Sequence, residues 1–295
     1  MRRIIITGAQ GQLGKRLVEQ LWQHNEMEAI ALDRNALNIS DYDAVLMALE
    51  RWSPDGVINA AAYTAVDQAE DEQELAHAVN AKGPENLARA CALKGIDFIH
   101  VSTDYVFNGL STTPYRTTDT PDPIGIYGVT KLAGETAVQK AFLEGGSNAK
   151  HWVFRVAWLY DAVGKNFLTT MLRLAEKSQP LRVVSDQWGS PTAAGPLASM
   201  LIDCMAAPNR LPAGVWHYGT EGPTHWCDFA KAIFELSDLQ VDVIPCSSSE
   251  YPTKARRPSY SYLDPYPLMT ALGRQAVPWK DELEHCLSEL NRTKR

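Results

Sequence analysis

The chain opens with an apolar strand-like run followed by three evenly spaced glycines, and this stretch constrains the fold more than any other. Residues 4–6 are three isoleucines, suited to a strand buried on both faces, and Gly8, Gly11 and Gly14 follow them. Apolar residues then recur at helical spacing, at Leu13, Leu17, Val18 and Leu21. Glycine lets the backbone turn sharply and lets a diphosphate approach the N-terminus of the following helix. The order strand, glycine loop, helix therefore predicts a dinucleotide-binding turn, with GxxGxxG spacing.

Strand-like and helix-like segments alternate along the first half of the chain. We expect strands at residues 4–6, 28–33, 56–59, 96–102 and 151–158, and helices at residues 42–51, 76–94 and from Ile126 onward. Alternating units of this kind predict a Rossmann-like, doubly wound parallel sheet covered by helices on both faces, an α/β fold. We interpret residues 1–180 as the dinucleotide-binding domain. Residues 181–295 are expected to form mainly a smaller substrate-binding region, with some segments returning to the first sheet.

Composition excludes several classes of protein. The chain has 295 residues and a net charge of −7, which argues against bulk nucleic-acid binding. It contains no run of 18 apolar residues, so we expect no membrane partner and a cytoplasmic location. The five cysteines are widely spaced and none forms a CxxC pair, which favours reduced thiols over disulfides or a zinc site.

Asp33 and Arg34 lie where a dinucleotide fold selects its cofactor. An acid roughly 20 residues past the glycines typically binds the adenosine ribose hydroxyls, whereas an arginine there can receive a 2′-phosphate. The pair is compatible with NADPH or NADH.

A second constellation supplies candidate chemistry. Tyr127 and Lys131 are four residues apart, so on a helix they share a face. A neighbouring ammonium stabilises a phenolate, so Lys131 could tune Tyr127 as an acid–base catalyst and also hold the nicotinamide ribose. Thr103 ends the fourth expected strand, and its hydroxyl could hydrogen-bond the reacting carbonyl oxygen. The sequence therefore predicts Thr103, Tyr127 and Lys131 as catalytic residues of a hydride-transfer enzyme.

Together these motifs resemble the extended short-chain dehydrogenase/reductase superfamily, and within it the dTDP-4-dehydrorhamnose reductase family. The segments that carry the narrower resemblance are residues 65–70 (AVDQAE), 102–107 (STDYVF), 127–135 (YGVTKLAGE), 154–160 (FRVAWLY), 186–192 (DQWGSPT) and 255–258 (ARRP). They span nearly the whole chain. The resemblance implies reduction of the C4 ketone of dTDP-4-dehydro-L-rhamnose to dTDP-L-rhamnose, with a small dTDP-sugar as the substrate.

The resemblance and the motifs define the expected site. The cofactor is expected to contact Gly8, Gln10, Gly11, Gln12, Leu13, Gly14, Asp33, Arg34, Asn38, Ile39, Ala60, Ala61, Ala62, Tyr127 and Lys131. The substrate is expected to contact Thr103, Asp104, Trp158 and Arg257, the last as a bidentate ligand of the substrate diphosphate.

Three alternatives stay open at this point. Related 4,6-dehydratases carry an acidic pair after the catalytic threonine, but here Asp104 is followed by Tyr105, which favours simple reduction over elimination. The chain could also reduce another nucleotide-linked 4-keto-sugar. A non-catalytic regulatory subunit, resembling that of methionine adenosyltransferase, is the third possibility, because fold and motif can outlast activity.

The resemblance also bears on metal and assembly. Some family members form a magnesium-bridged dimer through two acids, and this chain has Arg16 and Gly195 at the corresponding positions. A hard divalent cation needs oxygen ligands, so we expect no structural metal, and a monomer or weak homodimer.

Overall fold

The computed structural model describes residues 1–177 and 179–293, and a six-stranded parallel sheet forms its centre. The strands lie in the order β10-β5-β4-β3-β1-β2, and every neighbouring pair is parallel. Their bounds are β1 Arg2–Thr7, β2 Met27–Leu32, β3 Gly56–Asn59, β4 Asp97–Thr103, β5 His151–Val156 and β10 Gly214–His217. The order reverses between β1 and β3, and such a switch point is where doubly wound sheets bind ligands. The predicted fold class is confirmed.

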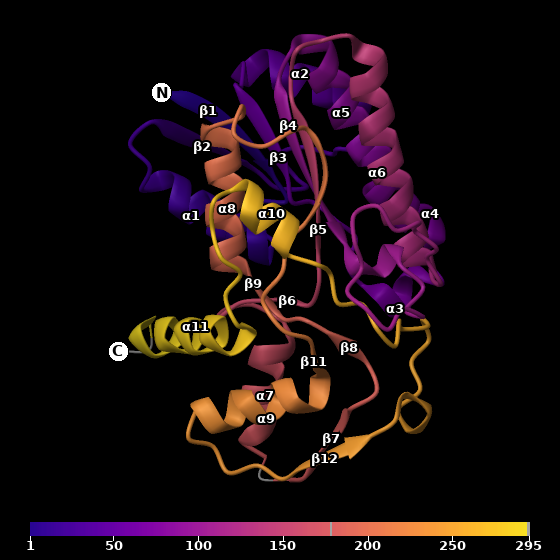
Figure 1. Ribbon diagram of the computed structural model, residues 1–295. Helices are drawn as coiled ribbons and strands as arrows, with labels where there is room; N and C mark the ends of the chain where they lie inside the picture. Colours follow the sequence, from indigo (N-terminus) through magenta and orange to yellow (C-terminus); the bar gives the residue numbers. More distant parts are fainter. Residues whose placement is uncertain (178, 294–295) are drawn as a thin grey trace.

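Helices cover both faces of the sheet (Figure 1). One face carries α1 (Gln12–Trp22), α8 (Ala194–Ala206) and α10 (Tyr266–Ala271), and the other carries α2 (Tyr42–Trp52), α5 (Gly83–Lys94) and α6 (Ile126–Gly145). Side chains alternate along β1, so Ile4 and Ile6 pack into the first core, with Leu17 and Leu201, while Ile5 packs into the second. Both faces of β1 are thus buried, as its run of isoleucines predicted.

The long helix expected at residues 76–94 is present but interrupted. It consists of α4 (Gln73–His77), a π-helical turn η1 (Ala78–Lys82) and α5, with Pro84 in the first turn of α5. Proline lacks an N–H and breaks the regular α-helical ladder, which is a physical reason for an irregular turn before it. Within η1, the Asn80 side chain accepts from Tyr63 N (2.8 Å) and donates to Tyr63 O (3.0 Å). This turn therefore fixes the loop after β3.

A smaller lower region packs beneath the carboxyl ends of the strands (Figure 1). Its helices are α7 (Phe167–Ala175), α9 (Trp226–Leu236) and α11 (Trp279–Thr293), around a core that includes Tyr160, Phe229 and Leu283. Its short strand pairs are β6 (Leu159–Tyr160) with β9 (Thr192–Ala193), β7 (Leu181–Val184) with β12 (Val243–Cys246), and β8 (Trp188–Gly189) with β11 (Thr224–His225). The remaining elements are α3 (Val66–Ala69) and the 3₁₀ turns η2 (Asp104–Val106) and η3 (Ser248–Glu250).

Segments from the second half of the chain return to the sheet, as expected. Strand β10 pairs with β5, and α8 packs on α1. The domain boundary at residue 180 itself stays a prediction.

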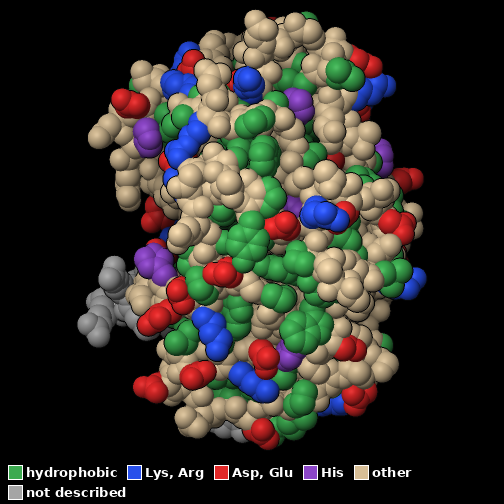
Figure 2. Space-filling model, viewed as in Figure 1, with side chains coloured by type: hydrophobic (Ala, Val, Ile, Leu, Met, Phe, Trp, Pro, Cys, Tyr) green, Lys and Arg blue, Asp and Glu red, His purple; other side chains and the backbone are tan. Residues whose placement is uncertain are grey.

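The surface and the thiols agree with the composition. Figure 2 shows acidic and basic side chains interspersed over the face that it presents. All five cysteines are buried as free thiols. Within residues 1–177 and 179–293, no helix is both long and apolar enough to cross a bilayer.

Candidate active site

The glycine loop after β1 is packed too tightly for a side chain at Gly8 or Gly14. Gly8 has φ +66°, and a Cβ on it would lie 2.7 Å from the backbone of Ala61. A Cβ on Gly14 would lie only 2.2 Å from the carbonyl oxygen of Gly8. Helix α1 begins at this loop with Gly11 as its N-cap, without a side-chain cap and without an acidic residue in its first turn. Its first backbone N–H groups can therefore donate to a phosphate, so the loop fits the diphosphate of a dinucleotide.

Most of the other expected cofactor residues surround this loop. Ala60, Ala61 and Ala62 follow β3, directly beside Gly8, and all three are half-buried. Gln10 is exposed and Gln12 is half-buried, so both side chains can meet a ligand. The side chain of Leu13 is different: it is 5% exposed and belongs to the core, so only its backbone can serve the cofactor.

The segment after β2 divides into exposed and buried positions. Asp33 Oδ1 accepts from the backbone N–H groups of Asn35 and Ala36, both at 2.9 Å, which orients the carboxylate and leaves Oδ2 for a ribose. Arg34 and Asn38 are exposed. Ile39 is buried in the core against Gly83, so its side chain does not line the site; its carbonyl accepts from Asn86.

Thr103 and Asp104 stand where β4 ends, and their side chains are joined. The Thr103 hydroxyl donates to Asp104 Oδ1 at 3.1 Å, and the same hydroxyl oxygen accepts from Tyr105 N at 3.2 Å. The other carboxylate oxygen, Oδ2, is buried and has no hydrogen-bond partner. Burial raises the pKa of Asp104 to about 6, against hydrogen bonds from Ser261 and Thr103 that lower it. An acceptor so placed is suited to a sugar hydroxyl.

Tyr127 enters the site from the first turn of α6. Its pKa lies above the ordinary value for a phenol, chiefly because of burial, while a hydrogen bond with the Thr103 side chain acts in the opposite direction. The edge of its ring meets Tyr105, with 5.5 Å between the centroids. Tyr127 and Thr103 are therefore brought together, as predicted, and the phenol holds its proton at neutral pH.

Lys131 also lies on the buried face of α6, but its amino group contacts β4. Its Nζ donates to Val101 O at 2.6 Å and lies 3.4 Å from His100 Nε2. The sequence predicted that Lys131 would stabilise the Tyr127 phenolate, yet the pKa of Tyr127 is raised in this structure. The physical reason is that burial dominates the phenol while the lysine head is held by β4. Burial likewise lowers the pKa of Lys131 to about 8, with Glu135 opposing the shift.

A buried ion pair holds α6 to the strands beneath it. Arg155 on β5 donates to Glu135 on α6, with Nη2 to Oε2 at 2.7 Å, and the two side chains are 4% and 1% exposed. Glu135 also accepts from the hydroxyl of Ser102, the residue before Thr103. The pair thereby joins β5, β4 and α6 at the level of the candidate catalytic residues.

Trp158 has a backbone conformation that is rare for a tryptophan. Its φ is +49°, in the left-handed region, and its ring stacks on Trp226 of α9 at 3.7 Å and 11°. A Cβ on Gly189 would lie 2.8 Å from the Trp158 ring. Strain of this kind persists only where the surroundings fix it and is concentrated at functional sites. Trp158 is half-buried between the sheet and the lower region, where a sugar ring could meet it.

Arg257 is tied to the segment 65–70 rather than projecting freely. Its guanidinium donates to Asp67 Oδ2 at 2.7 Å and to the Tyr105 hydroxyl at 3.2 Å. Asp67 also accepts from Ala255 N at 3.0 Å. These contacts place Arg257 beside Tyr105 and hence near Tyr127, while its remaining N–H groups can still meet an anion.

Arg16, at the expected metal position, binds carboxylates of its own chain. Its guanidinium donates to both oxygens of Asp161, the shortest distance being 2.6 Å, and to Glu289 Oε2 at 2.9 Å. Among residues 1–177 and 179–293, no cluster of three or more histidine, cysteine, aspartate or glutamate side chains could hold a metal ion. The arginine thus connects α1 to α11 electrostatically.

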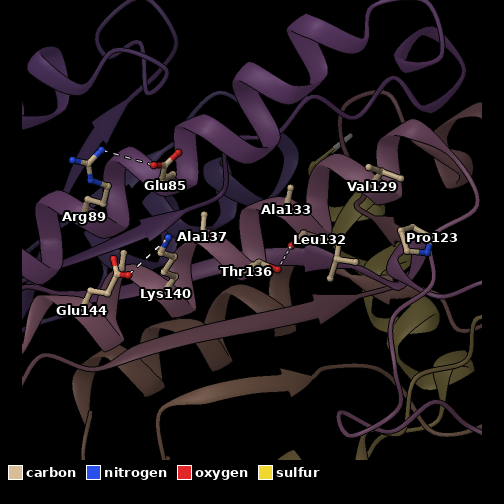
Figure 3. A pocket seen from close by; sticks show the side chains of 11 residues that line it. Glu85, Arg89, Pro123, Val129, Leu132, Ala133, Thr136, Ala137, Lys140 and Glu144 are labelled. Atoms are coloured by element: carbon tan, nitrogen blue, oxygen red, sulfur yellow. Dashed lines mark hydrogen bonds and ion pairs between the residues drawn. The ribbon is translucent and has the colours of Figure 1, made fainter.

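A hollow on the outer face of α5 and α6 does not serve this site (Figure 3). It has a volume of about 750 Å³, and small apolar side chains such as Ala133 and Ala137 line its floor. Its charged side chains pair within their own helices, Arg89 with Glu85 and Lys140 with Glu144. No polar groups converge there on a reacting atom.

Several residues that shape the site were missed by sequence reasoning. They are His100, Glu135, Arg155 and Trp226. A histidine inside an otherwise apolar strand is a signal for His100. Glu135 and Arg155 lie close in sequence to Lys131 and Trp158, but their mutual pairing, like the stacking of Trp226 on Trp158, arises only through tertiary packing.

Comparisons with known proteins agree with the geometry. The model of the family described as "RmlD substrate binding domain" matches residues 1–292. The spore coat polysaccharide biosynthesis protein SpsK of Bacillus subtilis is 39% identical, covering 98% of this chain and 98% of its own. A dTDP-4-dehydrorhamnose reductase of Aggregatibacter actinomycetemcomitans is 37% identical, covering 97% and 98%. The crystal structure of dTDP-4-dehydrorhamnose reductase from Bacillus anthracis in complex with NADP has a TM-score of 0.91 at 37% identity, covering 98% and 99%.

Proposed function

This chain belongs to the RmlD substrate-binding domain family, and from that membership and the site geometry we propose that it reduces the C4 ketone of dTDP-4-dehydro-L-rhamnose to dTDP-L-rhamnose. The observation that carries the proposal is the meeting of Thr103 and Tyr127 at the carboxyl end of β4, two strands from the glycine loop. A carbonyl reduction needs a hydride, a proton and a polarised oxygen, and this arrangement offers a place for each.

The cofactor is NADPH or NADH, and when bound it supplies the hydride. The glycine loop and the N-terminus of α1 would hold its diphosphate, Asp33 the adenosine ribose, and Arg34 a 2′-phosphate where one is present. The related Bacillus anthracis structure holds NADP, which supports the assignment of cofactor class.

The chain's own residues provide the proton and the alignment. Thr103 hydrogen-bonds the ketone oxygen and polarises it, and Tyr127 donates its phenolic proton as negative charge develops there. The raised pKa of Tyr127 keeps this proton in place at neutral pH. Asp104 accepts a sugar hydroxyl, Trp158 packs on the ring, and Arg257 contacts the diphosphate. These contacts orient the ketone toward Tyr127.

The remaining proposals concern compartment and assembly. Five buried free thiols suit a reducing compartment, so we place the reaction in the cytoplasm. We propose a monomer or weak homodimer that needs no bridging metal, because Arg16 already pairs with Asp161 and Glu289 within one chain. Sedimentation with and without a chelator tests this: a dimer that dissociates on chelation contradicts it.

The decisive experiment is a substrate panel. Purified protein is offered dTDP- and GDP-linked 4-keto-sugars with NADPH or NADH, and the alcohol formed is identified by NMR. We expect turnover first with the dTDP-linked 6-deoxy compound. Turnover only with another keto-sugar would reassign the substrate, and no oxidation of either cofactor with any of them would leave a binding function in place of catalysis.

A further inference from the structure

A buried row of polar side chains leads from Lys131 into the sheet, and the reaction as described does not use it. The row consists of Thr7 on β1, Asn59 on β3 and His100 on β4, and none of these side chains or that of Lys131 is more than 1% exposed. Thr7 Oγ1 donates to Asn59 Oδ1 at 2.6 Å, and Asn59 Nδ2 lies 3.0 Å from His100 Nδ1. His100 Nε2 then lies 3.4 Å from Lys131 Nζ.

The orientation of the Asn59 amide follows from its neighbours. The backbone N–H of Ala61 can only donate, and it points at Asn59 Oδ1 from 3.2 Å. The amide oxygen is therefore on that side, together with the Thr7 hydroxyl, and the NH₂ group faces His100. Because that NH₂ donates, His100 Nδ1 must accept and carries no proton.

The remaining ring nitrogen must then carry the proton of a neutral imidazole. The pKa of His100 is lowered well below its usual value, chiefly by burial, so the ring is neutral; a charge on Lys131 lowers this pKa further. Its Nε2–H therefore points at Lys131. A lysine ammonium has no lone pair to accept this hydrogen, whereas an uncharged amine has one.

We propose that His100 is a positioning residue: held by Asn59 as its Nε2–H tautomer, it donates to Lys131 and favours the uncharged amine until the nicotinamide ribose is bound. The uncharged amine satisfies every contact in the structure. Its lone pair accepts from His100, one N–H donates to Val101 O, and another N–H stays available. This inference rests on the proposed function in one respect, since it takes the ligand to be a nicotinamide dinucleotide.

Other charges near Lys131 are already compensated. Glu135, one turn along α6, favours the ammonium, but its carboxylate is paired with Arg155 of β5. The other titratable groups around this end of α6 are Tyr127, Tyr105 and Asp104. His100, on β4, presents a hydrogen-bond donor to Lys131. This contact favours the uncharged amine, whereas Glu135 favours the ammonium.

Cofactor binding shifts Lys131 from the uncharged amine to the ammonium. Ribose hydroxyl oxygens accept hydrogen bonds and the cofactor phosphates are anions, so both favour the lysine ammonium. Binding of the dinucleotide therefore takes up a proton. Because the pKa of Lys131 is lowered to about 8, we expect uptake of about half a proton for each NADPH bound near pH 8.

The tautomer is tested first on the unaltered protein by ¹⁵N NMR of its histidine rings, which distinguishes protonated from unprotonated ring nitrogens. The His100 resonances are assigned by their loss in His100→Gln, or by through-bond correlation if that variant does not fold. We expect a neutral ring with its proton on Nε2. A proton on Nδ1, or a charged ring at neutral pH, overturns the proposal.

The proton uptake is tested by calorimetric titration of NADPH near pH 8 in two buffers of different ionisation enthalpy. In His100→Gln the side-chain oxygen can accept from the ammonium, so uptake should fall about threefold or more. His151→Gln, at the start of β5, is the matched control and should keep the full uptake. Absence of uptake in the unaltered protein, or equal uptake in His100→Gln, overturns the proposal. Neither measurement uses a keto-sugar substrate, so a protein that binds NADPH but reduces no keto-sugar would refute the proposed function alone.

Discussion

The buried Glu135–Arg155 pair offers a quantitative test of how the site is held. We expect Glu135→Gln to lower the free energy of unfolding by ~3 kcal/mol, because it leaves the Arg155 guanidinium without its counter-charge at 4% exposure. Removing one partner of a buried pair typically costs ~3–5 kcal/mol, and the glutamine oxygen can still accept one hydrogen bond, which places the estimate at the low end. Stabilities of single domains are ~5–15 kcal/mol, so the loss is measurable without abolishing the fold.

Urea unfolding followed by tryptophan fluorescence measures this change. Arg182–Glu250 is the matched control, since its N–O distance is also 2.7 Å but its side chains are 52% and 54% exposed. Glu250→Gln should therefore leave the urea midpoint unchanged. Replacing both buried partners, by Glu135→Leu with Arg155→Met, should recover much of the loss because no charge is then stranded.

Two results would refute the reasoning. One is a Glu135→Gln variant within ~0.5 kcal/mol of the unaltered protein, the range of ordinary surface substitutions. The other is a comparable loss in the Glu250→Gln control. Either result would mean that burial does not determine how much the Glu135–Arg155 pair contributes to the free energy of unfolding.

Three further outcomes are expected. Tyr127→Phe should lower kcat by ~10²–10⁴ while the Kd for NADPH changes little, because only the proton donor is lost. Tyr266→Phe, which alters an exposed side chain at the start of α10, is the control, and a Tyr127→Phe enzyme with most of its turnover would exclude the phenol as the acid. Gly14→Ala should weaken NADPH binding about tenfold or more in a fluorescence titration, because its Cβ would meet the Gly8 carbonyl oxygen at 2.2 Å. The control Gly195→Ala, whose Cβ would have only a side-chain nitrogen at 4.0 Å, should bind NADPH normally. Equal affinities of the two variants would contradict the close-packing argument. Burial raises the pKa of Glu282 from 4.5 to about 7, so the protonated carboxyl stabilises the folded state and this stabilisation is lost as pH rises through that range. The Tm of Glu282→Gln relative to the unaltered protein should therefore rise between about pH 5 and about pH 8. A constant difference in Tm would contradict the pKa shift.

Local patterns in the sequence were sufficient for the fold class and for the elements at the switch point. The isoleucine run of β1 forms a buried strand, and the glycines after it allow a tight turn with positive φ at Gly8. Both follow from steric effects that act over a few residues. The same holds for Thr103 and Tyr127: a strand end and the first turn of a helix place them at the same edge of the sheet. The sequence also separated half-buried Asp33 and exposed Arg34 from the apolar strand before them.

Assignments by position along the chain were weaker where burial decides the outcome. Leu13 and Ile39 stand within expected cofactor segments, yet their side chains face the core. Leu13 lies in the first turn of α1 and Ile39 in the loop between β2 and α2, and at both places packing against the core decides which way the side chain turns. The relation between Lys131 and Tyr127 shows the same limit. Helical spacing puts both on one face, but only the carbonyl of Val101 and the ring of His100 determine where the amino group of Lys131 lies.

The sequence by itself determined the parallel α/β fold and the glycine turn after β1, since both depend on periodicity or on the conformational freedom of single residues. It also placed Thr103 at a strand end and Tyr127 in the first turn of a helix. Tertiary structure alone decided the protonation environment of the site. Contacts between residues that are distant in the chain create this environment: the Glu135–Arg155 pair, the Asn59–His100–Lys131 row and the stacking of Trp226 on Trp158. The burial of Asp104 likewise results from packing. Desolvation and hydrogen-bond direction depend on three-dimensional neighbours, and no local pattern encodes them.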